Sequence, residues 1–590
     1  SGEIATLTLT VVRHEPARVK RQPYRVKCTD GTYDVTLVFF HARDDYIRKI
    51  LPEGSLRLVS GTVDRFRGET QITHPDYVLA PEDAKDLPLV EPVYPLTEGL
   101  TLKTFGKAVR AAIEDIPDLP EWQDKTFHER QGWPSWSQAL RTVHSPDGPG
   151  ALSSENPARA RLAYDELLAN QLALQIMREK MKQRPGREIK GDGRLRAEVE
   201  KALPFQLTGS QRVALSEIGG NMAAPSAMLR LLQGDVGSGK TIVALFAMLD
   251  AVECGGQAAL MAPTEILARQ HMATIEPLVA PLGLKTAVLT GRDKGAVRKE
   301  TLTGLASGEI NIVVGTHALF QESVEMRDLM LAVIDEQHRF GVHQRLNLAT
   351  KGRGVDVLVM TATPIPRTLL LTAYGDLETS QLHEKPAGRK PIDTRTIPLS
   401  RLHEVSDAVE RRLADGAKVY WVCPLVEESE VSDLAAAEDR YAELKARLGD
   451  RVTLIHGRMK GPEKDAAMAR FAEGPPSILV ATTVIEVGVD VPDATVMIIE
   501  HAERFGLAQL HQLRGRVGRG SDDSVCLLLF GGPLSETAKA RLRILRETED
   551  GFRIAEEDLK LRGGGEILGT RQSGLPEFRL ADLTVHADLL

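Results

Sequence analysis

Hydrophobic and polar positions alternate in short runs through the first ninety residues, a pattern typical of β-strands. Glycines separate the runs, which comprise Ile4–Val12, Tyr24–Cys28, Tyr33–Phe40, Ser55–Val63 and Gln71–Leu79. Short strands in a segment of this size predict an OB-type barrel, whose strand faces and loops bind oligonucleotides. A β-barrel with a purely structural role fits the same pattern equally well.

Residues 91–202 have a different pattern, rich in proline, charge and helix-forming stretches. In Arg161–Leu168, for example, hydrophobic residues recur with helical spacing. We expect a helical connecting segment, and no chemistry is visible in it.

From Leu203 onward, continuous apolar runs alternate with helical stretches, which indicates parallel sheets covered by helices on both faces. The first set of predicted strands comprises Met228–Leu232, Ala258–Ala262, Ile310–Val314, Leu331–Ile334 and Val355–Met360. The second set comprises Lys418–Val422, Val452–Ile455, Ile478–Ala481, Val496–Ile499 and Val525–Phe530. We therefore predict a multidomain α/β chain with boundaries at 1–90, 91–202, 203–388, 389–547 and 548–590.

Size and composition support several globular domains. The chain has 590 residues, too many for one core, with 42% hydrophobic and 26% charged residues. No apolar run is long enough to span a bilayer. The cysteines (Cys28, Cys254, Cys423 and Cys526) are far apart in sequence, so we expect reduced thiols in a cytoplasmic protein. The formal net charge of −8 argues weakly against nucleic acid, but binding depends on where the basic residues lie.

Residues 234–241 read Gly-Asp-Val-Gly-Ser-Gly-Lys-Thr, a complete phosphate-binding loop between a predicted strand and a predicted helix. Gly234, Gly237 and Gly239 let the backbone wrap closely round a phosphate. Lys240 is expected to reach the β- and γ-phosphates, and the Thr241 hydroxyl to bind Mg²⁺. The alternative is a glycine-rich turn that binds nothing.

An acidic pair, Asp335 and Glu336, follows the apolar run Val333–Ile334. Asp335 is expected to hold the Mg²⁺, and Glu336 to act as general base toward the attacking water. Such a pair is common at strand ends and weak alone, but it follows the phosphate loop at a distance of about a hundred residues, which strengthens the prediction.

A cluster of guanidinium groups lies in the second α/β unit, within the run Gln512–Arg519. Permanently charged, planar groups suit the charge of a transferring phosphoryl group. We expect Gln512, Arg516 and Arg519 to complete the catalytic site when the two units close. A basic surface helix is the alternative.

The segment before the phosphate loop, Phe205–Gln211, offers a candidate nucleobase site. The amide of Gln211 can contact the adenine edge in bidentate fashion, and the ring of Phe205 can pack on the base. This pattern favours ATP over GTP as the fuel.

One loop of the predicted barrel is basic. Its basic residues are Arg13, Arg18, Lys20, Arg21, Arg25 and Lys27, against a single acid, Glu15. Basic residues follow phosphates, and an aromatic such as Tyr24 can stack on an exposed base. Phe66 competes with Tyr24 for this role. Most charge runs are only solvated, so the loop alone leaves nucleic-acid binding open.

Together these motifs resemble those of the superfamily 2 helicases, and within them the RecG family of bacterial fork-remodelling translocases. The matching segments are 234–241, 262–265, 315–317, 335–345, 361–367, 456–459, 481–490 and 509–519. The resemblance is specific from about 203 to 575 and much looser in the β-rich start. It implies two tandem RecA-like lobes, an N-terminal OB-type wedge domain and a helical linker.

The resemblance also implies roles for further residues. Thr361 and Thr363 look like the motif that couples hydrolysis to lobe movement, and Gln211 looks like the adenine reader. Residues 569–574 match the family's translocation motif, with Arg571 and Gln572 working against a helical hairpin at about 503–512. Positions that look like grips on the DNA backbone are Pro263, Thr264, Thr316, His317, Thr482 and Thr483.

The leading hypothesis is an ATP- and Mg²⁺-dependent double-stranded DNA translocase that remodels stalled forks and branch-migrates Holliday junctions. We expect a monomer in the cytoplasm, with branched DNA as substrate and single-stranded-DNA-binding protein as a further candidate partner. A transcription-repair-coupling translocase is the second hypothesis, although no polymerase-binding module is evident. His338 disfavours a DEAD-box RNA helicase. A non-hydrolysing, ATP-gated module that binds single-stranded DNA is the alternative from another class.

Overall fold

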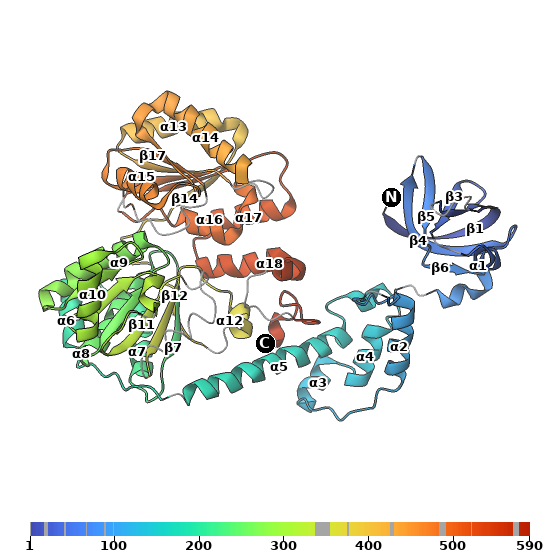
Figure 1. Cartoon of the computed structure of the whole chain (residues 1–590), viewed down its shortest axis with the longest axis horizontal. Coiled ribbons are helices and arrows are strands. Elements are labelled where there is room, and N and C mark those ends of the chain that lie inside the picture. The colour runs from blue at the N-terminus through green and yellow to red at the C-terminus, as the bar shows by residue number, and fades with distance from the viewer. Residues whose placement is uncertain are drawn as a thin grey trace. The chain divides into compact units, whose positions relative to one another are not determined.

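The computed structural model describes residues 2–16, 22–40, 43–66, 68–87, 90–97, 99–183, 185–321, 323–336, 354–373, 377–386, 388–424, 430–482, 491, 493–520, 522–569 and 578–590 (Figure 1). The chain divides into two compact units, Ser1–Leu162 and Ala163–Leu590. In the described part of the chain, no helix combines the length and the apolar character that crossing a membrane requires.

The first unit begins with a closed β-barrel. Its strands are β1 (Glu3–Glu15), β2 (Tyr24–Thr29), β3 (Asp34–Phe39), β4 (Leu56–Phe66), β5 (Glu69–Thr73) and β6 (Tyr77–Leu79). They are ordered β1-β2-β3-β5-β4-β6, and β1 also pairs with β4, which closes the barrel as predicted. Side chains on the inner face, among them Leu9, Val26 and Leu37, form its core. The structure adds a short helix, α1 (Asp44–Ile50), whose buried residue is Ile47.

Helices follow the barrel, as predicted from residues 91–202. They are α2 (Leu102–Glu114), α3 (Lys125–Gln131), α4 (Trp136–His144), η2 (Pro149–Leu152) and α5 (Pro157–Lys182), which runs into the second unit. A 3₁₀ turn, η1 (Pro81–Asp86), precedes them within the range predicted for the barrel. Side chains of Thr101, Asp124 and Ser135 accept backbone N–H groups at the starts of α2, α3 and α4. These caps explain why the helices begin where they do.

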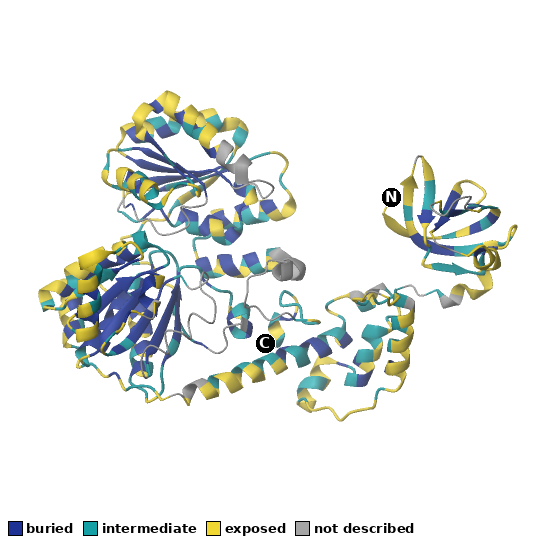
Figure 2. Ribbon diagram, viewed as in Figure 1, coloured by how far each residue is buried: buried dark blue, intermediate teal, exposed yellow. Residues whose placement is uncertain are grey.

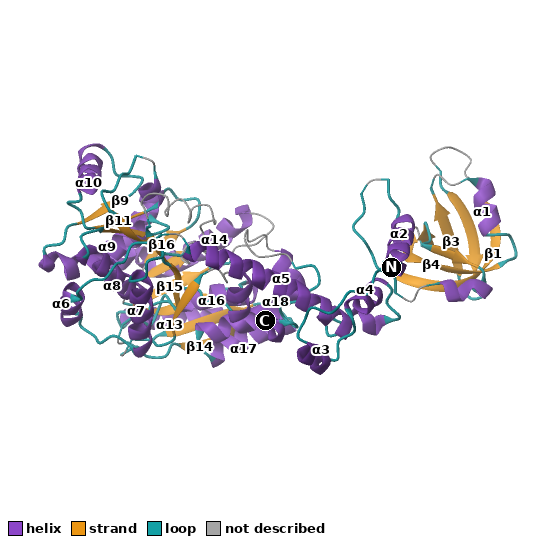
Figure 3. Ribbon diagram, turned by 90° about the horizontal axis from the view of Figure 1, so that it is seen from below, coloured by secondary structure: helices purple, strands orange, loops and turns teal. Residues whose placement is uncertain are grey.

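The second unit contains two α/β lobes (Figure 3). The strands of lobe 1 are β7 (Leu229–Gly234), β8 (Gln257–Met261), β9 (Thr286–Leu289), β10 (Ile312–Gly315), β11 (Leu329–Ile334), β12 (Asp356–Thr361) and β13 (Glu378–Leu382). They form a parallel sheet in the order β13-β7-β12-β11-β8-β10-β9. Its helices are α6 (Arg194–Ala202), α7 (Gly209–Met222), α8 (Lys240–Glu253), α9 (Glu265–Val279), η3 (Ala280–Leu282), α10 (Gly295–Ser307), η4 (His317–Phe320) and α12 (Arg367–Ala373).

Lobe 2 repeats this architecture with different strands. They are β14 (Asp393–Pro398), β15 (Lys418–Val422), β16 (Val452–Ile455), β17 (Ile478–Ala481), β18 (Ala494–Ile499) and β19 (Val525–Phe530), in the parallel order β14-β19-β18-β15-β17-β16. Its helices are η6 (Leu399–Arg401), α13 (Leu402–Ala414), α14 (Glu430–Leu448), η7 (Gly449–Arg451), α15 (Gly461–Glu473), η9 (Ala502–Arg504), α16 (Leu507–Arg514), α17 (Glu536–Glu547) and α18 (Gly551–Gly569), with η10 (Ala587–Leu589) near the C-terminus.

The cores of both lobes lie on the two faces of their sheets. The central strands are buried, while the outer faces of the helices are exposed (Figure 2). Helix α8 is an exception, because almost every residue after Lys240 is buried. A helix that is apolar on all faces packs inside a protein. Burial of α8 therefore holds its N-terminus in a fixed position beside the end of β7.

Candidate functional site

The phosphate loop lies where the sequence predicts it, between the end of β7 at Gly234 and the start of α8 at Lys240. Gly237 and Gly239 have φ angles of 75° and 87°, which side-chain-bearing residues rarely adopt. A Cβ atom on Gly239 would lie 2.3 Å from Nε2 of Gln211. The glycines are therefore required both by the backbone conformation and by close packing.

Lys240 is buried at the centre of this loop. Its ammonium group donates to the carbonyl oxygens of Gly234 at 2.7 Å and Asp235 at 2.9 Å. Burial lowers the pKa of Lys240, against the charges of Glu336, Asp335 and Asp235. A phosphate in the loop would offer this ammonium group a full negative charge in place of two carbonyl oxygens.

His271 of α9 joins the two residues that the sequence predicts as magnesium ligands. Its Nδ1 lies 3.4 Å from the Thr241 hydroxyl, and its Nε2 lies 2.8 Å from Oδ2 of Asp335. Burial pushes the pKa of Asp335 upward, but His271 and Lys240 outweigh it and hold the pKa below its ordinary value. A charged carboxylate beside a hydroxyl is a hard oxygen donor set, so these residues fit Mg²⁺ completed by phosphate and water oxygens.

Glu336 follows directly and has an unusual backbone, with a φ of 54°. Burial and the neighbouring Asp335 raise the pKa of its carboxyl group, while Lys240 and Arg516 oppose the rise. The backbone N–H of Ala362 donates to this carboxylate. A carboxyl group with a raised pKa suits a general base, because it accepts a proton more readily than a solvated glutamate.

The loop after β12 links Glu336 to the phosphate loop. The hydroxyls of Thr361 and Thr363 lie 2.9 Å apart, so these two residues hold the loop together rather than pointing outward. The N–H of Ile365 donates to the side chain of Gln233, the residue before Gly234, at 3.1 Å. The loop after β12 thus contacts Glu336 through Ala362 and the end of β7 through Ile365.

The predicted arginines of lobe 2 reach the same site. Arg516 lies near enough to Glu336, and Arg519 near enough to Lys240, for each charge to act on the neighbour's pKa. Gly515 packs on Val236 of the phosphate loop, where an added Cβ atom would meet the Val236 side chain at 3.0 Å. Gln512 lies half-buried on α16 of this segment. The two lobes thus share one site.

Further links between the lobes were not predicted from the sequence. Asp235 of the phosphate loop accepts from His511 of α16 at 2.8 Å and from the N–H of Gly551 at 3.1 Å. Arg389, between the lobes, packs on Gly237 and donates to the carbonyl of Val236 at 3.3 Å. Arg389, His511 and Gly551 are far from the phosphate loop in sequence, so only the folded chain brings them to it.

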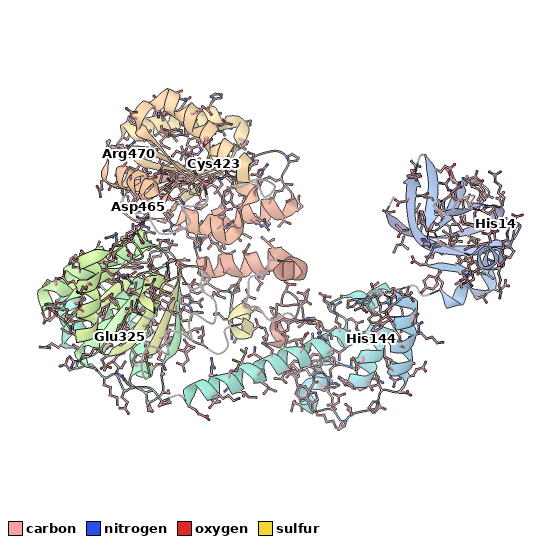
Figure 4. All side chains as sticks on the ribbon, viewed as in Figure 1. His14, His144, Glu325, Cys423, Asp465 and Arg470 are labelled. Carbon is pink, nitrogen blue, oxygen red and sulfur yellow. The ribbon has the colours of Figure 1, made fainter. Side chains whose placement is uncertain are left out.

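A separate ion-pair cluster joins the lobes away from the phosphate loop. Arg292 of lobe 1 pairs with Glu265 at 3.0 Å and with Asp465 of α15. Asp465 is labelled on the part of lobe 2 that faces lobe 1 (Figure 4). Because these side chains are partly exposed to solvent, we expect the ion pairs to add little stability.

The adenine prediction needs correction for Gln211. Its Oε1 accepts the N–H of Thr208 at 2.9 Å, and its Nε2 donates to the carbonyl of Ser238 at 2.8 Å. The amide thus closes a capping box at the start of α7 and supports the phosphate loop. Gln211 is only 1% exposed, so it does not present its amide to a base. Phe205 is partly exposed just before α7, where its ring is available to a base.

The predicted DNA grips lie at the carboxyl ends of strands. Pro263 and Thr264 follow β8, and Thr316 and His317 follow the neighbouring β10. Thr264 is partly accessible and caps α9, and His317 is exposed.

The prediction is wrong for the side chains of Thr316 and Thr482, which are each 3% exposed and cannot reach a phosphate from inside the lobes. Thr483 lies outside the described residues.

The predicted translocation segment is only partly described. Arg571 and Gln572 lie outside the described residues, which resume at 578. The predicted hairpin at 503–512 is instead a 3₁₀ turn, η9, followed by the single helix α16. The helices that pack together here are α16, α17 and α18. Glycines at Gly506 and Gly515 bound α16 and keep it short.

The prediction that Tyr24 stacks on a DNA base is wrong. Its ring is 3% exposed in the barrel core, and its hydroxyl lies 2.9 Å from Nδ1 of His14. A buried ring offers no face to a base, so Tyr24 supports the barrel instead. Phe66 is 49% exposed at the end of β4, where the chain turns into β5. Of the basic loop residues, Lys27 pairs with Glu69 at 2.8 Å and Arg13 with Glu15, while 17–21 lie outside the described residues.

Comparisons with known proteins agree with this architecture. The family model for the DEAD/DEAH box helicase matches residues 209–371, and the helicase conserved C-terminal domain matches 401–521. The model for ATP-dependent DNA helicase RecG, domain 3, C-terminal, matches residues 548–590.

Curated relatives are similar over almost the whole chain. The ATP-dependent DNA helicase RecG of Escherichia coli (strain K12) is 45% identical over 579 residues, covering 95% of this chain and 83% of the relative. That of Bacillus subtilis (strain 168) is 44% identical over 571 residues, covering 96% and 82%. A solved structure of RecG bound to a three-way DNA junction has 40% identity and a TM-score of 0.67, covering 100% of this chain and 78% of that one.

Proposed function

Because the chain belongs to the RecG family of ATP-dependent DNA helicases, we propose that it moves along double-stranded DNA and remodels branched junctions. Stalled replication forks and Holliday junctions are the substrates we assign to it. The RecG protein of known structure is bound to a three-way DNA junction, which supports a branched substrate.

One observation carries the proposal. Arg516 and Arg519 of lobe 2 lie close enough to Glu336 and Lys240 of lobe 1 for the charge of Arg516 to lower the pKa of Glu336 and that of Arg519 to lower the pKa of Lys240. Between them, Gly515 packs on Val236 of the phosphate loop. A nucleotide in this site would touch both lobes, and loss of its γ-phosphate would remove a charge that holds them together. Such a cycle of closure and release converts hydrolysis into movement.

The residues divide the chemistry among them. Glu336 accepts the proton of the attacking water, and Lys240 holds the β- and γ-phosphates. Arg516 and Arg519 stabilise the charge of the transferring phosphoryl group. Thr241 and Asp335 would hold a Mg²⁺ ion, which neutralises phosphate charge when bound. Ala362, Thr361 and Thr363 relay the state of Glu336 to β7.

Movement must then be passed to the DNA. We assign contacts with the phosphate backbone to Pro263, Thr264 and His317, which lie at adjoining strand ends and read no sequence. Arg571 and Gln572 would couple closure of the lobes to a step along the duplex. The barrel would separate the arms at the junction, with Phe66 as the exposed aromatic side chain that stacks on a base.

Several further properties belong to the same proposal. We assign the protein to the bacterial cytoplasm as a monomer, with ATP as the nucleotide. Single-stranded-DNA-binding protein is a candidate partner, because it covers the exposed strands at a stalled fork. No specific observation favours the second translocase hypothesis or the non-hydrolysing module.

ATP turnover on three DNA substrates tests the proposal. The rate should be highest with forked DNA, lower with linear duplex and lowest with single strands of equal length. In parallel, a labelled fork should be unwound only when ATP and Mg²⁺ are present. Equal stimulation by all three DNAs, or a preference for RNA, would overturn the assignment of branched DNA as substrate.

A further inference from the structure

Asp235 is the second residue of the phosphate loop, yet both of its carboxylate oxygens are bound by lobe 2. Oδ1 lies 2.8 Å from Nε2 of His511 on α16, and Oδ2 accepts the N–H of Gly551, the first residue of α18, at 3.1 Å. The side chain is 14% exposed. This side chain is therefore committed to the interface between the lobes and is not needed for holding phosphates.

The hydrogen bonds continue beyond His511. The guanidinium group of Arg514 donates to Nδ1 of His511 at 2.8 Å. Arginine can only donate, so Nδ1 must be an acceptor, and the ring proton must be on Nε2, which donates to Asp235. Arg514 also donates to the carbonyl oxygens of Leu545 at 2.5 Å and Thr548 at 3.0 Å, at the end of α17.

These contacts leave no space for a side chain at position 551. A Cβ atom on Gly551 would lie 1.8 Å from Oδ1 of Asp235 and 2.8 Å from Nε2 of His511. Burial would raise the pKa of Asp235, but His511, the N–H of Gly551 and Lys240 together hold it below its ordinary value. The carboxylate is thus charged at the N-terminus of α18, where the helix dipole favours a negative charge.

The backbone of Asp235 faces the catalytic site. Its carbonyl oxygen accepts from the Lys240 ammonium group at 2.9 Å. A triphosphate would draw the Lys240 ammonium group toward its own oxygens and release this carbonyl. The same residue therefore contacts the nucleotide-sensing lysine through its backbone and lobe 2 through its side chain.

We propose that Asp235, His511 and Arg514 form a positioning relay that passes the state of the phosphate loop to α17 and α18. In sequence, α18 (Gly551–Gly569) leads into the predicted translocation motif at 569–574. The relay couples ATP hydrolysis to movement along DNA. Its side chains do not take part in the hydrolysis reaction itself. This inference rests on the proposed function, because it assumes that turnover drives movement along DNA.

The test compares ATP turnover with fork unwinding in the full chain. In His511→Ala, ATP turnover on forked DNA should stay within about threefold of the original rate, whereas unwinding per ATP should fall by about tenfold. Asp235→Ala changes the phosphate loop itself, so it is compared by its unwinding per ATP alone, which should fall by a similar factor. His511→Gln keeps a donor that can reach Asp235 and should recover much of the loss. His403→Ala, an exposed histidine on α13 of the same lobe, is the matched control and should change neither rate.

A double variant distinguishes coupling between Asp235 and His511 from independent losses of function. If the two residues act through one contact, the double variant Asp235→Ala/His511→Ala should unwind as much DNA per ATP as either single variant. Gly551→Ala should give the same uncoupling by steric displacement of Asp235, without removing a hydrogen-bonding side chain. Parallel loss of turnover and unwinding, additive losses in the double variant, or no change in unwinding per ATP would overturn the relay.

The outcomes also distinguish failure of the relay from failure of the proposed function. If the unaltered chain does not unwind forks, the proposed function fails. If it does, and the His511→Ala protein keeps its unwinding per ATP, only the relay fails. Thermal unfolding of each variant identifies a misfolded protein, in which case His511→Gln and Gly551→Ala decide the matter.

Discussion

Nε2 of His271 lies 2.8 Å from Oδ2 of Asp335, and the other nitrogen of the same ring faces Thr241. One imidazole thus orients the carboxylate and the hydroxyl that fit Mg²⁺. Partners of this kind fix a ligand's orientation and are often as important as the ligand itself.

We predict that His271→Ala weakens the response to magnesium. Without the imidazole, Asp335 and Thr241 lose their orientation, and the Mg²⁺ concentration for half-maximal ATP turnover should rise about 10- to 100-fold. A magnesium titration of the binding of a fluorescent ATP analogue measures the same effect without turnover. An unchanged titration curve would show that His271 only fills space.

Removing either catalytic arginine should abolish fast hydrolysis without preventing nucleotide binding. Arg516→Ala or Arg519→Ala should lower kcat by about a thousandfold, because each variant loses a guanidinium group that we assign to stabilising the charge of the phosphoryl group. Arg470→Ala, an exposed arginine on α15, serves as control. Steady-state ATP turnover with forked DNA, beside equilibrium nucleotide binding, distinguishes the two effects. A loss of binding equal to the loss of kcat would contradict the assignment.

Phe66→Ala should reduce the unwinding of branched DNA without affecting activity on linear duplex. The ring is exposed at the turn between β4 and β5, so its removal should reduce unwinding of forked DNA by about three- to tenfold, the loss of one stacking contact. ATP turnover on linear duplex should not change. Tyr46→Ala, which removes another exposed aromatic side chain of the barrel, on α1, is the control. If both variants unwind forks normally, Phe66 does not contact the junction.

Ionisation of the buried Asp356 carboxyl group should make lobe 1 less stable as the pH rises. Burial raises the pKa of this carboxyl group from 3.8 to about 7, although it accepts the N–H of Met228. The folded chain therefore binds a proton more tightly than the unfolded chain. The resulting stabilisation is complete below the unfolded-state pKa of 3.8 and is lost as the pH rises toward about 7. By linkage this loss is at most about 4 kcal/mol.

The variant Asp356→Asn isolates this effect. Asparagine does not ionise, so the fall in unfolding temperature between pH 5 and 8 should be smaller in the variant by several degrees. Other buried acids, such as Asp250, titrate in the same range, so the difference between the two proteins is the informative quantity. Parallel curves would show that Asp356 is already ionised at pH 5.

The strands that sequence patterns missed share a position in the fold. The chain folds β9, β13 and β14 at the edges of the two parallel sheets, where a strand has only one neighbour. Central strands are buried on both faces and are therefore continuously apolar, which makes them easy to predict. Edge strands such as Glu378–Leu382 and Asp393–Pro398 carry polar side chains, and β9 is only four residues long.

The site was predictable where its residues form contiguous motifs. The phosphate loop, the acidic pair and the arginine segment are found by local spacing. His271 and His511 are not, because their roles depend on partners 64 and 276 residues away. The predictions for Tyr24 and Gln211 failed for a related reason. A sequence pattern identifies a side chain, but it does not show whether the folded protein buries that side chain or binds it to other groups.

Glu336 gives the most direct test of a motor in which two lobes share one ATP. Glu336→Gln keeps the size and polarity of the side chain but removes the base that activates water. The variant should bind ATP and forked DNA as the original chain does, yet lose DNA-stimulated ATP turnover and fork unwinding together. DNA-stimulated turnover at the original rate would contradict the account.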